Sequence, residues 1–148
     1  MVSGLSHITF IVRDLDRAEA LLTGVLDARK VYDSGDRTFS LSRERFFLVG
    51  RETGDPDAPA PVWIVTMEGE PRPSRTYDHV AFRIDDGDYN ACLERVRRLG
   101  LEVREGRPRV GGEGRSIYFH DDDDHLFELH TGTLGERLAR YAAREDAP

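Results

Sequence analysis

The sequence contains few of the residues that cross-link small proteins, and it has no long apolar segments. A single cysteine, Cys92, in 148 residues excludes a disulfide scaffold or a thiolate metal cluster within one chain. No apolar run approaches the length of a membrane-spanning helix, and the segment MVSGLSHITF has neither the basic region nor the long apolar stretch of a secretion signal. These absences predict a cytoplasmic enzyme or binding protein.

Lysine is almost absent too, because Lys30 is the only lysine among 21 basic residues. The 28 acidic residues give a net charge of −7, which repels a phosphate backbone and argues against nonspecific nucleic-acid binding. Arginine, in contrast, suits bidentate contacts with carboxylates and phosphate-like anions. The length fits one domain or two tightly packed half-domains, and 39% hydrophobic residues are enough for a core.

Three polar residues interrupt apolar segments that are typical of β-strands. His7 lies in LSHITFIV, His79 in YDHVAFRI and Glu128 in HLFELH. An unpaired ionisable group is costly to bury at such positions, so something should offset the cost. Two imidazoles and one carboxylate suit Mn(II), Fe(II), Co(II), Ni(II) or Zn(II), with coordination positions left for water and substrate.

The chain also repeats itself, since HITFIVRD from His7 and HVAFRIDD from His79 align without a gap. Each is followed by a helical pattern, at 15–28 and at 88–100, and then by strand-like segments. The first half has these at 29–34, 37–42, 45–50 and 62–69, and the second half at 101–105, 115–121 and 125–130. Two such halves should pair, because neither buries a sheet face alone.

We therefore predict an α+β fold in which tandem βαβββ units pair into a cup-shaped mixed sheet. The chain is expected to form a single domain at 1–148, with one repeat at about 4–68, a second at about 76–132 and a C-terminal helix at about 133–144. Strand alternation places Thr9 on the face of His7, and His130 on the face of Glu128. His125 falls on the opposite face of its strand, after an acidic turn.

A segment rich in arginine and glycine, REGRPRVGGEGRSIYF, follows the second helix. Its glycines permit close backbone approach, and its arginines supply donors for a small phosphonate, phosphate or carboxylate. Ser116 and Tyr118 share a strand face and can point at the same ligand. In the C-terminal helix, with Thr133 as a possible N-cap, Arg137 either projects toward the anion or pairs with acidic surface residues. The alternative for the whole segment is a flexible hairpin with solvated arginines.

Together with the repeat, these motifs resemble the vicinal oxygen chelate superfamily, which includes glyoxalases, bleomycin resistance proteins and extradiol dioxygenases. Within it, the strings SGDRTFSLSRERFFL, RPRVGGEGRSIYF and HLFELHTGTLGERL resemble the fosfomycin epoxide hydrolases, over about residues 5–141. The resemblance implies Mn(II)-dependent addition of water to the epoxide of fosfomycin, and a homodimer of paired βαβββ units. Residues 51–61 are an apparent insertion relative to that pattern.

The resemblance also implies roles for individual residues. It makes His7, His79 and Glu128 the metal ligands. Glu44, which its charged neighbours alone would make a solvated turn residue, becomes the general base. The remaining matches are to positions of the substrate pocket, namely Thr9, Trp63, Arg107, Arg109, Arg115, Ser116, Tyr118 and Arg137.

Other functions of the same superfamily stay open at this stage. A thiol transferase acting on fosfomycin needs no carboxylate base, because a thiol brings its own acidic proton, so Glu44 favours water. A glyoxalase-like isomerase would need a fourth ligand, and VWIVTMEG offers none before Glu68. A catechol dioxygenase fits the arginine-rich loop poorly, and a drug-sequestering protein would not need the three proposed ligands.

Overall fold

The chain forms two compact units of similar construction, residues 1–73 and residues 74–148. The computed structural model describes residues 2, 4–38, 40–51, 59–72, 74–104 and 114–145. Unit 1 contains β1 (His7–Val12), α1 (Leu15–Leu26), β2 (Arg29–Asp33), β3 (Glu44–Val49) and β4 (Val62–Glu68). Unit 2 contains β5 (His79–Arg83), a short 3-10 turn η1 (Asp86–Asp88), α2 (Tyr89–Arg98), β6 (Glu102–Arg104), β7 (Ser116–His120), β8 (Leu126–His130) and α3 (Leu134–Glu145).

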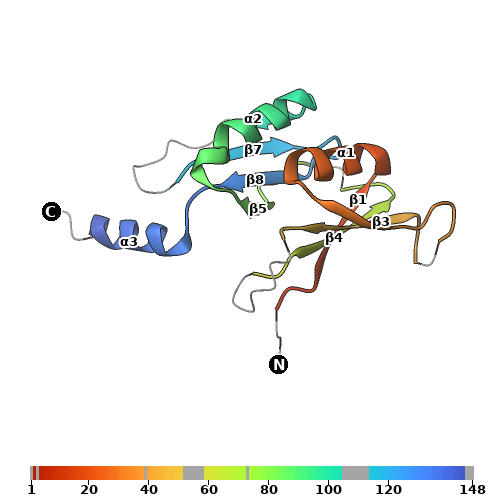
Figure 1. Cartoon of the computed structure of the whole chain (residues 1–148), viewed down its shortest axis with the longest axis horizontal. Coiled ribbons are helices and arrows are strands. Elements are labelled where there is room, and N and C mark those ends of the chain that lie inside the picture. The colour runs from red at the N-terminus through yellow and green to blue at the C-terminus, as the bar shows by residue number, and fades with distance from the viewer. Residues whose placement is uncertain are drawn as a thin grey trace. The chain divides into compact units, whose positions relative to one another are not determined.

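The two units have the same sheet topology. Unit 1 has the strand order β1-β4-β3-β2 and unit 2 the order β5-β8-β7-β6. Figure 1 shows β5, β8 and β7 of unit 2 following one another in this order. In each, the first pair is parallel and the other pairs are antiparallel. The predicted α+β architecture of tandem βαβββ units with mixed sheets is thus confirmed, and the two histidines that open β1 and β5 are equivalent.

One face of each sheet is covered by a helix and holds the core. In unit 1, Phe47 and Ile64 are fully buried on the side of α1. In unit 2, Phe119 stacks on Phe127, with ring centroids 5.6 Å apart, on the side of α2 and its buried Val96. Because strand side chains alternate, the polar residues between these core positions are turned to the other face. We call these other faces the site faces of the two units.

The helix boundaries follow from local hydrogen bonds. The carboxylate of Asp14 accepts from the backbone N–H groups of Asp16 and Arg17, at 2.8 and 3.0 Å, and so caps α1. Beyond α2, Gly100 has a φ of +70°, a conformation that glycine adopts at little cost. The N–H of Leu101 then donates to the carbonyl of Val96, which satisfies one of the last helical acceptors.

One predicted strand is wrong. Within 37–42, residues 37, 38 and 40–42 form no strand, and Leu41 is 92% exposed. The alternation of apolar and polar residues was present there, but no neighbouring strand pairs with the described part of this segment.

No helix in the described part of the chain is long and apolar enough to cross a bilayer. Residues 52–58 of the apparent insertion lie outside the described residues.

Candidate metal and substrate site

Two of the three predicted metal ligands meet on the site face of unit 2. Ala81 of β5 is paired with Glu128 of β8, so the carboxylate lies beside the strand that His79 opens. The Nε2 atom of His79 is 3.1 Å from Oε2 of Glu128. A neutral imidazole nitrogen and a carboxylate oxygen that face each other in this way form two adjacent donors for a divalent cation.

His79 is oriented by a backbone carbonyl at its other ring nitrogen. Its Nδ1 atom lies 2.8 Å from the carbonyl oxygen of Tyr77, which can only accept a hydrogen bond. Nδ1 is therefore protonated, and in the neutral ring this leaves the lone pair of Nε2 for a metal ion. Metal-binding histidines commonly have such a partner, so these residues fit a resident divalent metal.

Glu128 is a buried carboxylate with several partners. It is 4% exposed and accepts a hydrogen bond from Oγ of Ser116 at its Oε1 atom. Burial by itself would raise the pKa of Glu128, but hydrogen bonds from Ser116 and Tyr118 and the nearby imidazoles of His130 and His79 outweigh it, so the pKa lies below its usual range. The carboxylate is thus held in the ionised form that a metal ligand requires.

The hydrogen bonds continue from Ser116 to α3. Oγ of Ser116 is 2.8 Å from Nδ1 of His130, and Nε2 of His130 is 3.5 Å from a guanidinium nitrogen of Arg137. Because the single hydroxyl proton of Ser116 goes to Glu128, His130 must donate from Nδ1, and its Nε2 then accepts from Arg137. A directional chain therefore runs from Arg137 through His130 and Ser116 to Glu128.

Tyr118 lies across the sheet from Glu128, to which it is paired in register. Its side chain is 6% exposed, and its hydroxyl is 3.4 Å from that of Tyr77. Burial, with the neighbouring hydroxyl of Tyr77 and the carboxylate of Glu128, raises the pKa of Tyr118. The phenol keeps its proton and acts as a hydrogen-bond donor.

Unit 1 supplies the second part of the predicted site on its own site face. His7 is paired with Trp63, and their ring centroids are 4.6 Å apart. Thr9 follows His7 on the same face, and Phe46 packs against Trp63 with centroids 5.3 Å apart. In unit 1, Val65 occupies the place that Glu128 has in unit 2, opposite Thr9 rather than Ala81. The aligned strands thus give unit 1 one predicted ligand, whereas unit 2 has two.

Glu44 is not the solvated turn residue that its charged neighbours indicated. It opens β3 and is only 8% exposed. Its backbone N–H donates to the hydroxyl of Ser34, and its carbonyl accepts from the backbone N–H of Ser34, both at 3.0 Å. Its partner in register is Met67, and alternation from Met67 through Val65 to Trp63 puts Glu44 on the site face that carries His7. A buried carboxylate therefore shares the sheet face of a predicted metal ligand.

Other predicted residues are placed differently. Arg115 pairs with Asp86 at 2.9 Å and stacks over the ring of Tyr89 at 4.1 Å, so an anion would have to compete with Asp86 for it. Arg107 and Arg109 lie outside the described residues.

Among the residues described, no group of three His, Cys, Asp or Glu side chains assembles within metal-binding reach. His7 belongs to unit 1 and the other two ligands to unit 2, so their union stays a prediction.

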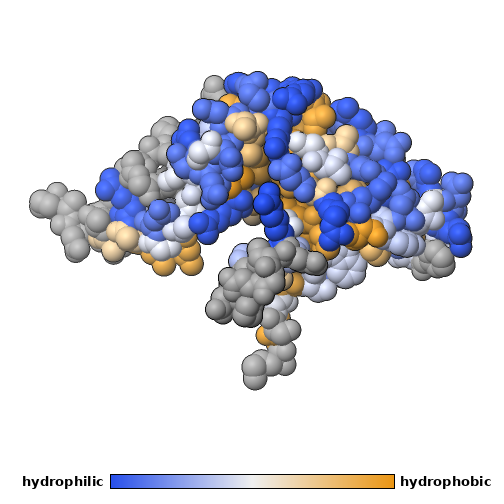
Figure 2. Space-filling model, viewed as in Figure 1, coloured by the Kyte–Doolittle hydropathy of each residue, from blue (hydrophilic) through white to orange (hydrophobic). Residues whose placement is uncertain are grey.

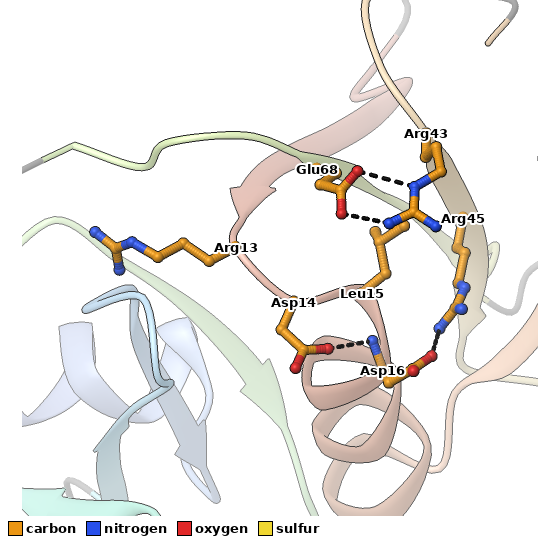
Figure 3. A pocket seen from close by; sticks show the side chains of 7 residues that line it. All are labelled: Arg13, Asp14, Leu15, Asp16, Arg43, Arg45 and Glu68. Atoms are coloured by element: carbon orange, nitrogen blue, oxygen red, sulfur yellow. Dashed lines mark hydrogen bonds and ion pairs between the residues drawn. The ribbon is translucent and has the colours of Figure 1, made fainter. Parts of the chain in front are cut away.

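A charged pocket of about 290 Å³ lies elsewhere in unit 1, at the start of α1 (Figure 3). The guanidinium of Arg43 binds both oxygens of Glu68, at 2.5 and 2.9 Å, and Arg45 pairs with Asp16 at 2.7 Å. Arg13, which also lines it, pairs with Glu70 at 3.3 Å. Since its arginines are held by carboxylates, this pocket is a weak candidate for an anion site. Because the side chain of Glu68 lines this pocket, it is turned away from the site face of unit 1.

Sequence reasoning missed two contributors. His130 was recognised as sharing the face of Glu128, but its link to Ser116 and Arg137 depends on side-chain positions that strand alternation does not give. Tyr77 acts on His79 through a backbone carbonyl, which any residue possesses. A hydrogen bond to a backbone carbonyl leaves no signature in a sequence.

Comparisons with known proteins agree on one family. The Glyoxalase/Bleomycin resistance protein/Dioxygenase superfamily matches residues 4–129. The fosfomycin resistance protein FosX of Mesorhizobium japonicum is 58% identical over 96% of this chain and 95% of its own length. The metallothiol transferase FosB of Shouchella clausii is more distant, at 35% identity over 95% of this chain and 88% of its own.

Solved structures extend the likeness to three dimensions. A mutant of FosX from Listeria monocytogenes, crystallised with Mn(II) and 1S,2S-dihydroxypropylphosphonic acid, is 48% identical, with a TM-score of 0.80. The alignment covers 95% of this chain and 99% of that one. FosX from Mesorhizobium loti is 55% identical, with a TM-score of 0.79 and coverage of 95% and 100%.

Proposed function

We propose a function from the finding that the chain belongs to the glyoxalase/bleomycin resistance protein/dioxygenase superfamily, and within it to the fosfomycin resistance proteins FosX. The chain hydrates the epoxide of fosfomycin with Mn(II) as cofactor. The product would be a dihydroxypropylphosphonate, and the outcome would be resistance to the antibiotic. The observation that carries the proposal is the buried Glu44 on the site face of His7, in addition to the ligand pair His79–Glu128.

His7, His79 and Glu128 would hold the metal ion. Bound there, Mn(II) would act as a Lewis acid that withdraws charge from the epoxide oxygen. The chain prepares for it by keeping Glu128 ionised and by fixing the ring of His79 through the carbonyl of Tyr77. The ligands come from both units, so we propose that the two units work as one catalytic domain.

Glu44 would serve as the general base. Both its backbone N–H and its carbonyl are hydrogen-bonded to Ser34, which limits the positions that the carboxylate can reach. The carboxylate would take the proton of a water molecule as the oxygen of that water forms a bond to an epoxide carbon. The breaking C–O bond leaves an alkoxide, which then takes up a proton to give the second hydroxyl of the diol.

The phosphonate would be held by donors on the site face of unit 2 and by polar residues of unit 1. The guanidinium of Arg137, near His130, is the described donor best placed for it, whereas the hydroxyl of Tyr118 already donates to Glu128 and would have to turn to reach the phosphonate. In unit 1, Thr9 and the ring of Trp63 would line the pocket beside His7. Arg107, Arg109, Arg115 and Ser116 stay as proposed contacts on the sequence pattern and the resemblance.

The proposal is tested by phosphorus NMR of fosfomycin incubated with the protein, in parallel samples with Mn(II), with EDTA, and with Mn(II) plus glutathione or bacillithiol. We expect the diol with Mn(II), unreacted fosfomycin with EDTA, and no effect of thiol on the yield of diol. A thiol adduct as main product would favour the transferase instead. Binding of fosfomycin without turnover, equally tight after EDTA, would indicate a sequestering protein.

The proposal includes a homodimer and a cytoplasmic location. One face of α3 presents Leu134, Leu138 and Tyr141, which are 73%, 57% and 43% exposed, and Figure 2 shows apolar surface along the lower side of this helix. Residues at this spacing lie on one stripe of a helix, and a second copy would remove the stripe from water. The composition of the chain is the reason for proposing the cytoplasm.

A further inference from the structure

The two oxygens of Glu128 have different partners. Oε1 accepts the proton of Ser116, whereas Oε2 lies 3.1 Å from Nε2 of His79. A carboxylate with one oxygen occupied by a hydroxyl offers its other oxygen to a cation. Hydrogen bonds from Ser116 and Tyr118 both hold Glu128, and Ser116 is the donor whose Oγ also meets His130. The contact at Oε1 depends on the hydroxyl rotor of Ser116, which by itself can turn toward any acceptor nearby.

His130 determines which way that hydroxyl points. Its Nδ1 atom is 2.8 Å from Oγ of Ser116 and 3.6 Å from Oε1 of Glu128, and its side chain is 15% exposed. By donating to Oγ, the imidazole leaves the hydroxyl with Glu128 as the acceptor for its own proton. Arg137, at 3.5 Å from Nε2, supports the same tautomer from the other side of the ring.

We infer that His130 is a positioning residue of the metal site, which acts through Ser116 to direct one oxygen of Glu128 to the metal ion. This inference rests on the proposed function for the identity of the metal. It assigns the hydroxyl proton of Ser116 to Glu128 rather than to the phosphonate. Residues that orient metal ligands typically change metal affinity about 10- to 100-fold when they are removed.

Five variants and a matched control test the inference by the dissociation constant for Mn(II), measured by equilibrium dialysis without fosfomycin. We expect His130→Ala to bind Mn(II) about 10-fold more weakly than the parent protein. His130→Asn should stay within about 3-fold, because its amide nitrogen stands near the place of Nδ1 and can donate to Ser116. His130→Gln should resemble His130→Ala, since its amide nitrogen stands nearer the place of Nε2.

The pathway through Ser116 is tested by a double-mutant cycle. In a Ser116→Ala background, His130→Ala should cause no further loss of Mn(II) affinity, because the residue through which it acts is gone. His125→Ala is the control, since His125 lies in the same β7–β8 hairpin but pairs with Asp121 at 2.7 Å. This control should bind Mn(II) like the parent, and circular dichroism should show that all variants are folded.

Parent-like affinity in His130→Ala, equal losses in the parent and Ser116→Ala backgrounds, or equal affinities of the Asn and Gln variants would each overturn the inference. If His130→Ala does not fold, the comparison of Asn with Gln decides. Failure of the parent to bind Mn(II) would overturn both the inference and the proposed function. Normal Mn(II) binding with the expected variant pattern but no hydration of fosfomycin would overturn the proposed function alone.

Discussion

Glu44 and Ser116 occupy equivalent positions in the two units, because each opens the third strand of its βαβββ repeat. Glu44 is paired with Met67, and Ser116 with His130 at the corresponding place of unit 2. The two units therefore share the same backbone arrangement at this position, but the side chains there have different proposed roles. In unit 1 the position carries the proposed base, and in unit 2 it carries the hydroxyl that orients a proposed metal ligand.

The role of Glu44 predicts a separation of binding from turnover. Glu44→Gln keeps the size of the side chain but cannot take a proton from water, so we expect kcat to fall about 10²- to 10⁴-fold. The dissociation constants for Mn(II) and for fosfomycin, measured by calorimetry, should stay near those of the parent. Glu70→Gln, which alters a carboxylate in an exposed ion pair with Arg13, is the control. Hydration by Glu44→Gln at the parental rate would show that the base is another group.

The sequence alone singles out His7, His79 and Glu128 as predicted metal ligands, because each interrupts an apolar strand and two of them recur in the repeat. It was insufficient for Glu44 without a family resemblance. Glu44 stands between Arg43 and Arg45, and such a charged run is usually solvated. The sheet register, in which Glu44 faces the same side as Trp63 and His7, is a tertiary property that this local pattern does not contain.

At the scale of elements, α3 begins with a capping box. Oγ1 of Thr133 accepts from the N–H of Glu136, while the Glu136 carboxylate accepts from the N–H of Thr133 at 2.7 Å and from its hydroxyl at 2.8 Å. The sequence predicted Thr133 as the cap, because the pattern is local. It did not reveal that strand-like alternation at 37–42 would lack a partner, since pairing depends on residues far along the chain.

The capping box makes the start of α3 sensitive to acid. The hydrogen bonds from Thr133 lower the pKa of Glu136 below its usual 4.5, so their contribution is complete above that value and is lost as the pH falls through the lowered pKa. We expect the amide proton shift of Thr133, followed by NMR, to titrate at a pH below 4.5. In Glu136→Gln this titration should be absent. A midpoint above the ordinary value would contradict the hydrogen-bonded geometry.

At the scale of the whole molecule, two units with one topology supply different parts of one proposed site. Unit 2 brings together His79 and Glu128, and unit 1 carries His7 with Glu44. The repeat in the sequence is the reason for proposing this division, because it puts His7 and His79 at equivalent positions of the two units. Single-chain strand patterns do not specify whether the partner unit comes from the same chain or from a second copy.

The proposed homodimer gives a prediction about mass and about α3. Light scattering should give twice the mass of one chain. Leu138→Glu should weaken the dimer about 10-fold or more, since a buried leucine contributes roughly 1.5–3 kcal/mol. Ala139→Glu adds the same charge to the next position of α3 and should have a smaller effect. A monomeric parent, or equal effects of both substitutions, would contradict an interface at Leu138.

Hydration of the epoxide is tested most directly by following the oxygen atom that enters the product. The parent protein, loaded with Mn(II), is given fosfomycin in water enriched in oxygen-18, with a thiol also present, and the product is analysed by mass spectrometry. We expect a diol that carries one labelled oxygen, no thiol adduct, and no product when Mn(II) is removed. A thiol adduct, or a diol formed equally well without the metal ion, would show that the chain is not a metal-dependent epoxide hydrolase.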